Sequence, residues 1–151
     1  GYTALAVAGA PINFAGLDQD CLSQSTSLNL SLLLQCRAAK LPRDNTTFTD
    51  PRVKAVIAIN PVDSSIFGKS GLSQIQIPTM IVAGSADTVA PALPEQIRPF
   101  TWLTTPDRYL VMIDQGTHFS ALADSDNAPG RSDNASSRID FPPEIIGPQP
   151  A

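Results

Sequence analysis

Three stretches of almost continuously apolar residues stand out along the chain. They are VKAVIAINP at 53–61, PTMIVAG at 78–84 and RYLVMID at 108–114. Short runs of this kind are typical of strands that are buried on both faces of a parallel sheet. We therefore predict a strand in each of them.

Apolar residues with helical spacing lie between these runs. The stretch 1–10, GYTALAVAGA, predicts a helix whose small residues pack closely on a sheet face. A second helix is predicted over 22–39, and a third over 92–103 with an interruption at Pro99. In the second helix the spacing places these apolar residues on one face: Leu28, Leu32, Leu33 and Cys36. We predict loops or polar connectors at 11–20, 41–52 and 61–77, and a polar, Pro-rich stretch from 124 onwards.

Strands that alternate with helices indicate an α/β fold with a mainly parallel sheet. Three strands are fewer than a parallel sheet with two covered faces normally has. The chain also begins at Gly1 without a starting Met and within a predicted helix. We therefore expect it to be an internal piece of a longer protein, with further strands before Gly1.

The charge and composition exclude some functions. Charged residues make up 16% of the chain and the formal net charge is −4, so no basic surface for nucleic acid or anionic lipid is expected. No apolar run approaches the roughly 20 residues that span a bilayer. Two cysteines without a CxxC pair and a single histidine argue against a Cys/His zinc site.

Cys21 and Cys36 leave two interpretations open. A disulfide between them would close a loop of about 15 residues and stabilise the fold by roughly 3 kcal/mol. Such a bond would imply an oxidising compartment. The alternative is a pair of ordinary thiols.

Two residues that can carry chemistry follow consecutive predicted strands. Asp87 comes shortly after 78–84, and His118, the single histidine, comes shortly after 108–114. In parallel sheets functional groups gather beyond the carboxyl ends of the strands. A carboxylate there can orient an imidazole, whose other nitrogen then acts as a general base. Asp87 could instead be a turn or helix-cap residue, and His118 an ordinary surface histidine.

These segments resemble the α/β-hydrolase superfamily. VAGSADTVAP at 82–91 is similar to the acid-bearing segment of its dienelactone-hydrolase, platelet-activating-factor-acetylhydrolase and cutinase-like branch, and YLVMIDQGTHFS at 109–120 is similar to its last strand and histidine loop. GYTALAVAGA resembles the helix after a nucleophile elbow. The run from 52 to 122, and then FPPEIIGP at 141–148, particularly resembles secreted or envelope α/β-hydrolases of cyanobacteria, which implies an extracellular, periplasmic or cell-envelope location.

The resemblance implies the C-terminal part of an α/β-hydrolase fold. Residues 1–122 would form a partial domain, with 11–50 a cap over the active site or a plain surface excursion, stapled by Cys21 and Cys36. Residues 123–151 would form a flexible segment before a C-terminal helix outside the chain. The implied reaction is hydrolysis of a lipid, short-chain or polymeric carboxylic ester, with no metal or organic cofactor. Asp87 and His118 would be the acid and base of a triad whose Ser precedes Gly1.

Other residues have smaller roles in this interpretation. Asp63 is the second candidate for the acid. Pro61 and Val62, at the end of the first strand, and Phe119, beside the histidine, are candidates for substrate contact. The chain's own candidates for a nucleophile lie outside any Gly-x-Ser-x-Gly turn, and we expect them to be structural: Ser64, Ser65, Ser85 and Ser120.

The missing nucleophile keeps other functions open. A dehalogenase would have Asp where an esterase has Ser, a peptidase would use the same triad, and a non-catalytic relative would bind ligands or partners. We expect residues 1–151 alone to be inactive and unstable, because an unpaired sheet edge and an exposed helix face favour aggregation.

Overall fold

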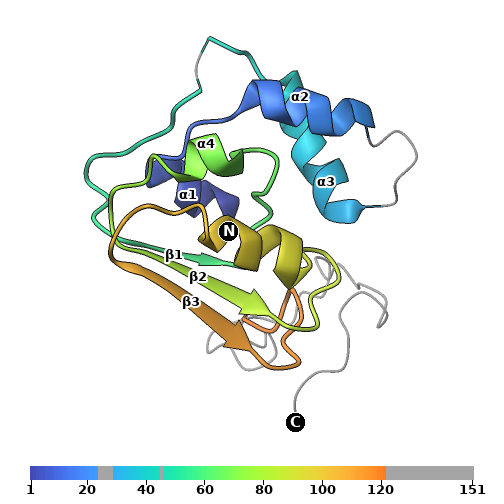
Figure 1. Ribbon diagram of the computed structural model, residues 1–151, viewed down its shortest axis with the longest axis vertical. Coiled ribbons are helices and arrows are strands. Elements are labelled where there is room, and N and C mark those ends of the chain that lie inside the picture. Colours follow the sequence, from blue (N-terminus) through green and yellow to red (C-terminus); the bar gives the residue numbers. More distant parts are fainter. Residues whose placement is uncertain (24–28, 45, 122–151) are drawn as a thin grey trace, which may run out of the picture.

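The structure is a computed structural model that describes residues 1–23, 29–44 and 46–121. Its strands form one parallel sheet in the order β1-β2-β3 (Figure 1). The mainly parallel α/β architecture predicted from the apolar runs is confirmed. The strands are β1 Val56–Ile59, β2 Thr79–Gly84 and β3 Arg108–Ile113.

The register of the sheet brings the ends of all three strands to one edge. Val56 pairs with Thr79, and Thr79 pairs with Arg108, so the strands start level with one another. The segments that follow them therefore begin side by side at the carboxyl edge. This is the edge where the predicted site residues were expected.

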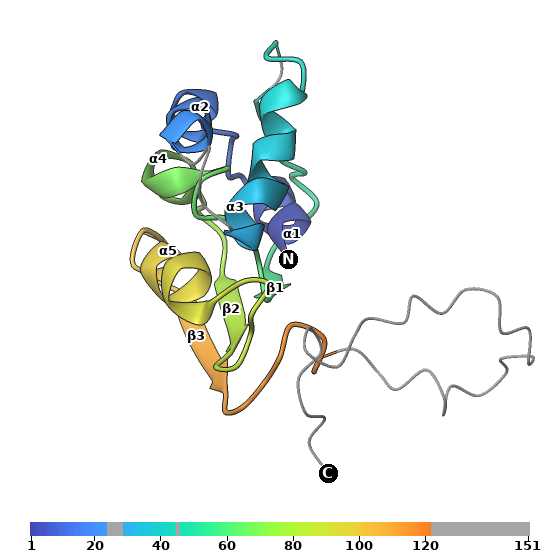
Figure 2. The same ribbon diagram turned by 90° about the vertical axis from the view of Figure 1, so that its right-hand side faces the viewer.

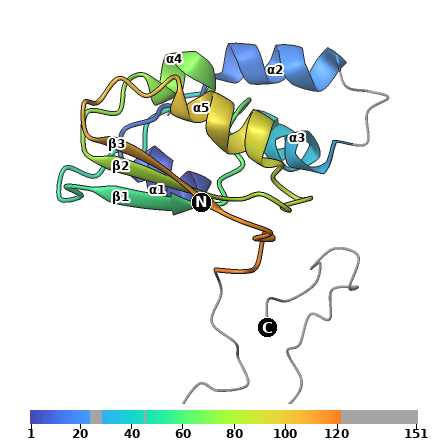
Figure 3. The ribbon, with the colours of Figure 1, turned by 60° about the horizontal axis from the view of Figure 1, so that its bottom comes forward.

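Most helices are short, and Figures 2 and 3 show them from two further directions. In Figures 1 and 3, α2 lies farthest from the sheet and α3 lies beyond the arrowheads of the strands. No helix among the described residues is long and apolar enough to cross a membrane. The helical elements are α1 Tyr2–Val7, α2 Phe14–Ser23, α3 Leu30–Gln35, the 3₁₀ helix η1 Cys36–Lys40, α4 Gly68–Leu72, the π-helix η2 Leu93–Ile97 and α5 Arg98–Phe100.

The hydrophobic core lies between the helices and one face of the sheet. Val56, Ala58 and Ile81 point into it and are buried. On the other face Ile57 is 60% exposed, and most of β3 is exposed as well. The prediction that the strands are buried on both faces was therefore wrong for the described residues, because their helices cover only one face. The core consists chiefly of Leu5, Ala8, Ile12, Val56, Ala58, Phe67, Leu72, Ile75, Ile81 and Leu103.

The region predicted as a loop and one long helix is folded differently. Helix α2 begins at Phe14, where the Asn13 side chain accepts a hydrogen bond from Gly16 N–H at 3.2 Å. The helix buries Leu17. A new helix, α3, begins after Asn29, whose side chain accepts from Leu32 N–H at 3.2 Å. These two Asx caps set boundaries that the apolar spacing did not reveal.

Helix α3 buries one of the predicted apolar residues, Leu32, together with two polar residues. Ser31, Leu32 and Gln35 are buried, whereas Leu33 is 52% exposed. The physical reason is a polar anchor, described below, that turns Ser31 and Gln35 toward the interior. Leu28 lies outside the described residues.

The chain passes Pro99 without leaving the helix, contrary to the prediction of an interruption there. It does so by way of the π-helix η2, which runs directly into α5. Pro99 has no N–H to give to the preceding turn, and the wider π turn lies just where an α-helical bond would be lost.

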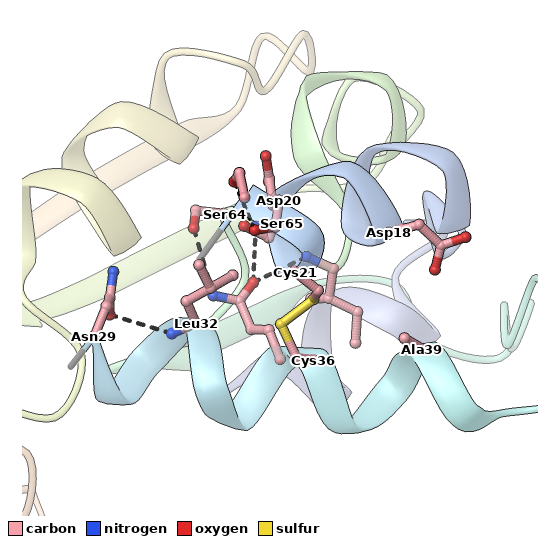
Figure 4. Close-up of a disulfide and its surroundings, with 12 residues drawn as sticks. Asp18, Asp20, Cys21, Asn29, Leu32, Cys36, Ala39, Ser64 and Ser65 are labelled. Atoms are coloured by element: carbon pink, nitrogen blue, oxygen red, sulfur yellow. Dashed lines mark hydrogen bonds between the residues drawn. A yellow bond between two sulfur atoms is a disulfide. The ribbon is translucent and has the colours of Figure 1, made fainter. Parts of the chain in front are cut away.

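We call α2, α3 and η1, residues 14–23 and 29–40, the cap segment. A disulfide joins Cys21 in α2 to Cys36 at the start of η1 (Figure 4). At the surface Arg43 donates two hydrogen bonds to Asp18, at 2.6 and 2.9 Å. This contact lowers the pKa of the Asp18 carboxyl. The disulfide therefore links α2 to η1 within the cap segment, and the ion pair links α2 to the connector that follows η1.

Candidate active site

The structure brings Asp87 and His118 into direct contact. His118 Nδ1 lies 2.8 Å from Asp87 Oδ2. The Asp87 side chain is completely buried, and that of His118 is 23% exposed. The contact occupies Nδ1, so Nε2 is the nitrogen left for chemistry. This is the arrangement in which a carboxylate orients an imidazole as a general base.

The loop after β2 binds the second oxygen of the Asp87 carboxylate, the one that does not meet His118. This oxygen, Oδ1, accepts hydrogen bonds from Val89 N–H and Ala90 N–H, both at 2.8 Å. Asp87 is thus also the turn-forming residue that we considered from the sequence. The two roles use different oxygens, and the backbone bonds fix the carboxylate in the orientation that meets His118.

Asn60 connects the ends of β1 and β2 to the loop that carries His118. Its Nδ2 donates to the carbonyls of Thr117, at 3.2 Å, and His118, at 2.9 Å. Its Oδ1 accepts from Gly84 N–H at 3.1 Å. The backbone of Asn60 has a φ of 42°, a conformation that Asn adopts more readily than most residues. This one buried side chain therefore fixes the backbone on both sides of the His118 peptide.

Two glycines let the histidine loop lie directly on the strand end. A β-carbon at Gly84 would overlap the carbonyl oxygen of Gly116. That carbonyl accepts a hydrogen bond from Ala86 N–H at 2.9 Å. The segments carrying the acid and the histidine are thus in backbone contact, which sets the separation of Asp87 and His118.

A cavity of about 850 Å³ opens beside His118. The cap segment, α1 and the ends of β1 and its loop form its walls. His118 and Asn60 line one side, and Gly1 lines it as well. The other lining residues are Tyr2, Thr3, Ala6, Val7, Ile12, Leu34, Gln35, Arg37, Ala38, Leu41, Phe48, Val62, Ile66 and Phe67.

The three residues predicted to contact substrate lie in different places. Val62 lines the cavity. Pro61 is not among the lining residues, and its carbonyl accepts a hydrogen bond from Gln96 Nε2 at 2.8 Å. Phe119 is not among them either, and its ring meets the ring of His118 edge-on with centroids 5.2 Å apart. Its place suits support of the imidazole.

A buried carboxylate, Glu95 of η2, anchors the cap segment to the rest of the fold. Its oxygens accept hydrogen bonds from Ser31 Oγ at 2.7 Å and from Gln35 Nε2 at 3.2 Å, both in α3. They also accept from Ser64 Oγ at 2.9 Å and from the N–H groups of Asp63 and Ser64, at 3.0 and 3.1 Å.

The Gln35 side chain also accepts hydrogen bonds, and we call Glu95, Gln35 and their hydrogen-bond partners the polar anchor. Gln35 Oε1 accepts hydrogen bonds from Ser65 N–H at 2.7 Å and Ile66 N–H at 2.9 Å. Figure 4 shows Ser64 and Ser65 close to α3 and its disulfide. The loop after β1 and the cap segment are therefore joined by buried hydrogen bonds as well as by apolar contacts.

Asp63, the second candidate for the acid, is in a different environment from Asp87. It is completely buried, and neither carboxyl oxygen has a hydrogen-bond partner. Burial, reinforced by the nearby charge of Glu95, raises the pKa of Asp63 well above its usual range. The carboxyl that meets His118 is that of Asp87.

The four serines considered as nucleophiles all have structural contacts. Ser64 Oγ and Ser65 N–H belong to the polar anchor. Ser85 Oγ accepts from Gln115 N–H at 2.7 Å, and Ser120 Oγ accepts from Thr117 N–H at 2.8 Å. Within the described residues, no three His, Cys, Asp or Glu side chains are grouped to hold a metal ion.

The parallel sheet, with Asp87 and His118 after consecutive strands, fits the class of α/β-hydrolases, and a family comparison supports this class. The family model described as PET hydrolase-like matches residues 44–132, more than half of the chain. The chain therefore belongs to the PET hydrolase-like family. The matched residues include the loops after β2 and β3 that carry Asp87 and His118.

Among solved structures, the monoacylglycerol lipase of Paleococcus ferrophilus is similar, with 16% sequence identity and a TM-score of 0.33 over 75% of this chain. The chain spans about half the length of that lipase, 47%. No curated protein matches the sequence.

Proposed function

We propose that the chain carries the acid and the base of a serine esterase. The observation that supports this most strongly is the 2.8 Å contact between His118 Nδ1 and Asp87 Oδ2, made by the loops after two consecutive parallel strands. In an α/β-hydrolase the nucleophile precedes both in the sequence. We place it before Gly1, at a strand-to-helix corner that leads into α1.

The position of Gly1 supports this placement of the nucleophile. Gly1 begins the turn into α1 and lines the same cavity as His118. A β-carbon at Gly1 would overlap the backbone of Pro61, so the chain here lies tightly against the end of β1. A residue shortly before Gly1 would therefore enter at the carboxyl edge, next to the histidine.

The reaction follows from these positions. The serine hydroxyl attacks the ester carbonyl while His118 Nε2 takes its proton. Asp87 holds the imidazole by Nδ1 and stabilises the cation that forms. Backbone N–H groups at the corner stabilise the oxyanion. The intermediate collapses, and the departing alkoxide takes the proton from His118. Water then attacks the acyl enzyme with His118 again as the base, which releases the carboxylic acid and restores the serine.

The test is the hydrolysis of 4-nitrophenyl acetate by the full-length gene product and its variants. We expect His118→Ala and Asp87→Asn each to lower kcat/KM by about 10³- to 10⁴-fold. Asp114→Asn is the matched control, because Asp114 also follows a strand but its carboxylate meets Ser85 and not His118. Equal losses in all three variants, or none, would refute the assignment.

A further inference from the structure

The carboxyl group of Asp63 is buried without a hydrogen-bond partner among the described residues. Asp63 is 0% exposed, and both of its carboxyl oxygens, Oδ1 and Oδ2, are unpaired. Buried polar side chains nearly always have a partner, because leaving water without one is costly. We therefore expect a neighbouring part of the protein to supply hydrogen bonds to this group.

Helix η2 holds the backbone around Asp63 in place. Glu95 accepts hydrogen bonds from the N–H groups of Asp63 and Ser64, at 3.0 and 3.1 Å. Gln96 Nε2 donates to the Pro61 carbonyl at 2.8 Å. Both η2 residues are buried. The Asp63 side chain is therefore held in the interior and is not free to turn toward water.

The start of α1 leads to the segment that can supply the partner. Gly1 lies against the end of β1, where a β-carbon would overlap the Ile59 carbonyl oxygen and the Pro61 Cα. Asp63 follows two residues later, and its carboxyl lies within electrostatic range of the Gly1 nitrogen. In the longer protein this nitrogen belongs to the peptide that joins Gly1 to the turn in which we place the nucleophile.

We propose that Asp63 is a positioning residue for the nucleophile: its carboxyl group hydrogen-bonds the backbone of the turn immediately before Gly1. This inference rests on the proposed function and adds a residue to the same site. Asp63 acts there through the turn, because the carboxyl that meets the imidazole is that of Asp87. A turn held by this contact keeps the serine hydroxyl within reach of His118 Nε2.

The neutral form of the carboxyl suits this contact. Burial and the nearby charge of Glu95 raise the pKa of Asp63, which favours the neutral acid. A neutral carboxyl donates from its hydroxyl and accepts at its other oxygen, so it can bond both a carbonyl and an N–H of the same turn. An Asn side chain can do the same with its amide, whereas Leu has a similar shape and no polar atom.

The experiment uses the full-length protein with 4-nitrophenyl acetate as the substrate. We expect Asp63→Leu to lower kcat by about 10- to 100-fold with little change in KM, because a misplaced serine slows the chemical step more than it weakens binding. Asp63→Asn should keep kcat within about threefold of the wild type, because the amide restores the hydrogen bonds. Asp63→Ala removes the same oxygens and takes the place of Asp63→Leu if that variant does not fold.

Thr79→Val is the matched control. Thr79 is also buried, and its Oγ1 donates to the Ile77 carbonyl at 2.9 Å, but it begins β2 at the opposite edge of the sheet. Val has a similar shape without the hydroxyl, so this variant should lose stability and keep its kcat. The control separates the general effect of removing a buried polar group from an effect on the nucleophile.

Amide hydrogen exchange separates this inference from the proposed function, because it requires no catalysis. In Asp63→Leu, but not in Asp63→Asn, exchange should become about tenfold faster in the peptide that contains the turn and Gly1, with no change in β3. If the wild type hydrolyses no ester but exchange changes in this way, the esterase proposal fails and the contact of Asp63 with the turn stands.

Four results would overturn the inference. Exchange in the turn is unchanged in Asp63→Leu or Asp63→Ala, or an active protein keeps its kcat in these variants. Asp63→Asn loses as much activity as Asp63→Leu, or Thr79→Val does.

Discussion

Asn60 offers the sharpest test of how the histidine loop is held. Asn60→Asp keeps the acceptor for Gly84 N–H but removes both donors to the loop, and it sets a carboxylate against the carbonyls of Thr117 and His118. At about 0.5–1.5 kcal/mol per hydrogen bond, the loss alone lowers the free energy of unfolding by about 1–3 kcal/mol. The repulsion between the oxygens adds to it.

Two further substitutions separate the side chain from the backbone. Asn60→Ala and Asn60→Gly both remove all three hydrogen bonds, and both must adopt a φ of 42°, which is costly for Ala but not for Gly. We expect Ala to be less stable than Gly by about 1 kcal/mol. Gln115→Ala is the control, because Gln115 also has a positive φ, 53°, but is exposed.

The assays are urea unfolding and ester hydrolysis by the same full-length preparations. A loop that moves by a fraction of an ångström misaligns His118 with its nucleophile, so kcat should fall by about 10- to 100-fold in Asn60→Asp with a smaller change in KM. The explanation fails if Asn60→Asp unfolds at the same urea concentration as the wild type and turns over ester as fast as Gln115→Ala.

Two other predictions concern the buried carboxyl groups. Because the pKa of Asp63 is raised in the folded state, its contribution to stability is fully present below the unfolded-state pKa near 4 and is lost as the pH rises through the folded-state value. The side chain introduced by Asp63→Asn does not titrate, so the free energy of unfolding of this variant, measured in urea, should rise relative to that of the wild type between pH 4 and pH 8. A difference between the two proteins that does not depend on pH would contradict this prediction. Glu95→Ala removes the acceptor for the N–H groups of Asp63 and Ser64 and for the side chains of Ser31, Gln35 and Ser64, and it should cost about 3–5 kcal/mol. In Glu95→Ala, amide hydrogen exchange in α3 should be faster than in the wild type, with a smaller change in β2. Unchanged exchange in α3 would show that Glu95 does not hold this helix in place.

The sheet could be predicted because its signal is local. Each strand is an apolar run bounded by Pro, Gly or polar residues, and β2 spans nearly the whole run at 78–84. The pair Asp87 and His118 was found for a related reason. Consecutive parallel strands must end at the same edge, so residues that follow them become neighbours.

The cap segment and its anchor could not be predicted in the same way. Glu95 is separated by 60 residues from Gln35 and by 64 from Ser31. Nothing in the local pattern near any of them indicates the others. The polar face of α3 instead reads as its solvent side, and this is why the burial of Ser31 and Gln35 was missed.

Asn60 was missed as a support of His118 for a similar reason. Its place at the end of a strand could be read from the sequence, but its contacts with Thr117 and His118 lie 57 and 58 residues away. A small hint exists, since Asn before Pro at a strand end is compatible with a tight turn and with a positive φ.

In the proposed mechanism, Asp87 and His118 activate a serine that precedes Gly1. The most direct measurement is labelling of the full-length protein with a fluorophosphonate, followed by mapping of the modified peptide by mass spectrometry. We expect one adduct, on a serine before Gly1, that His118→Ala abolishes and Asp114→Asn retains. An adduct on a serine within residues 1–151, or no adduct in a folded wild-type protein, would contradict it.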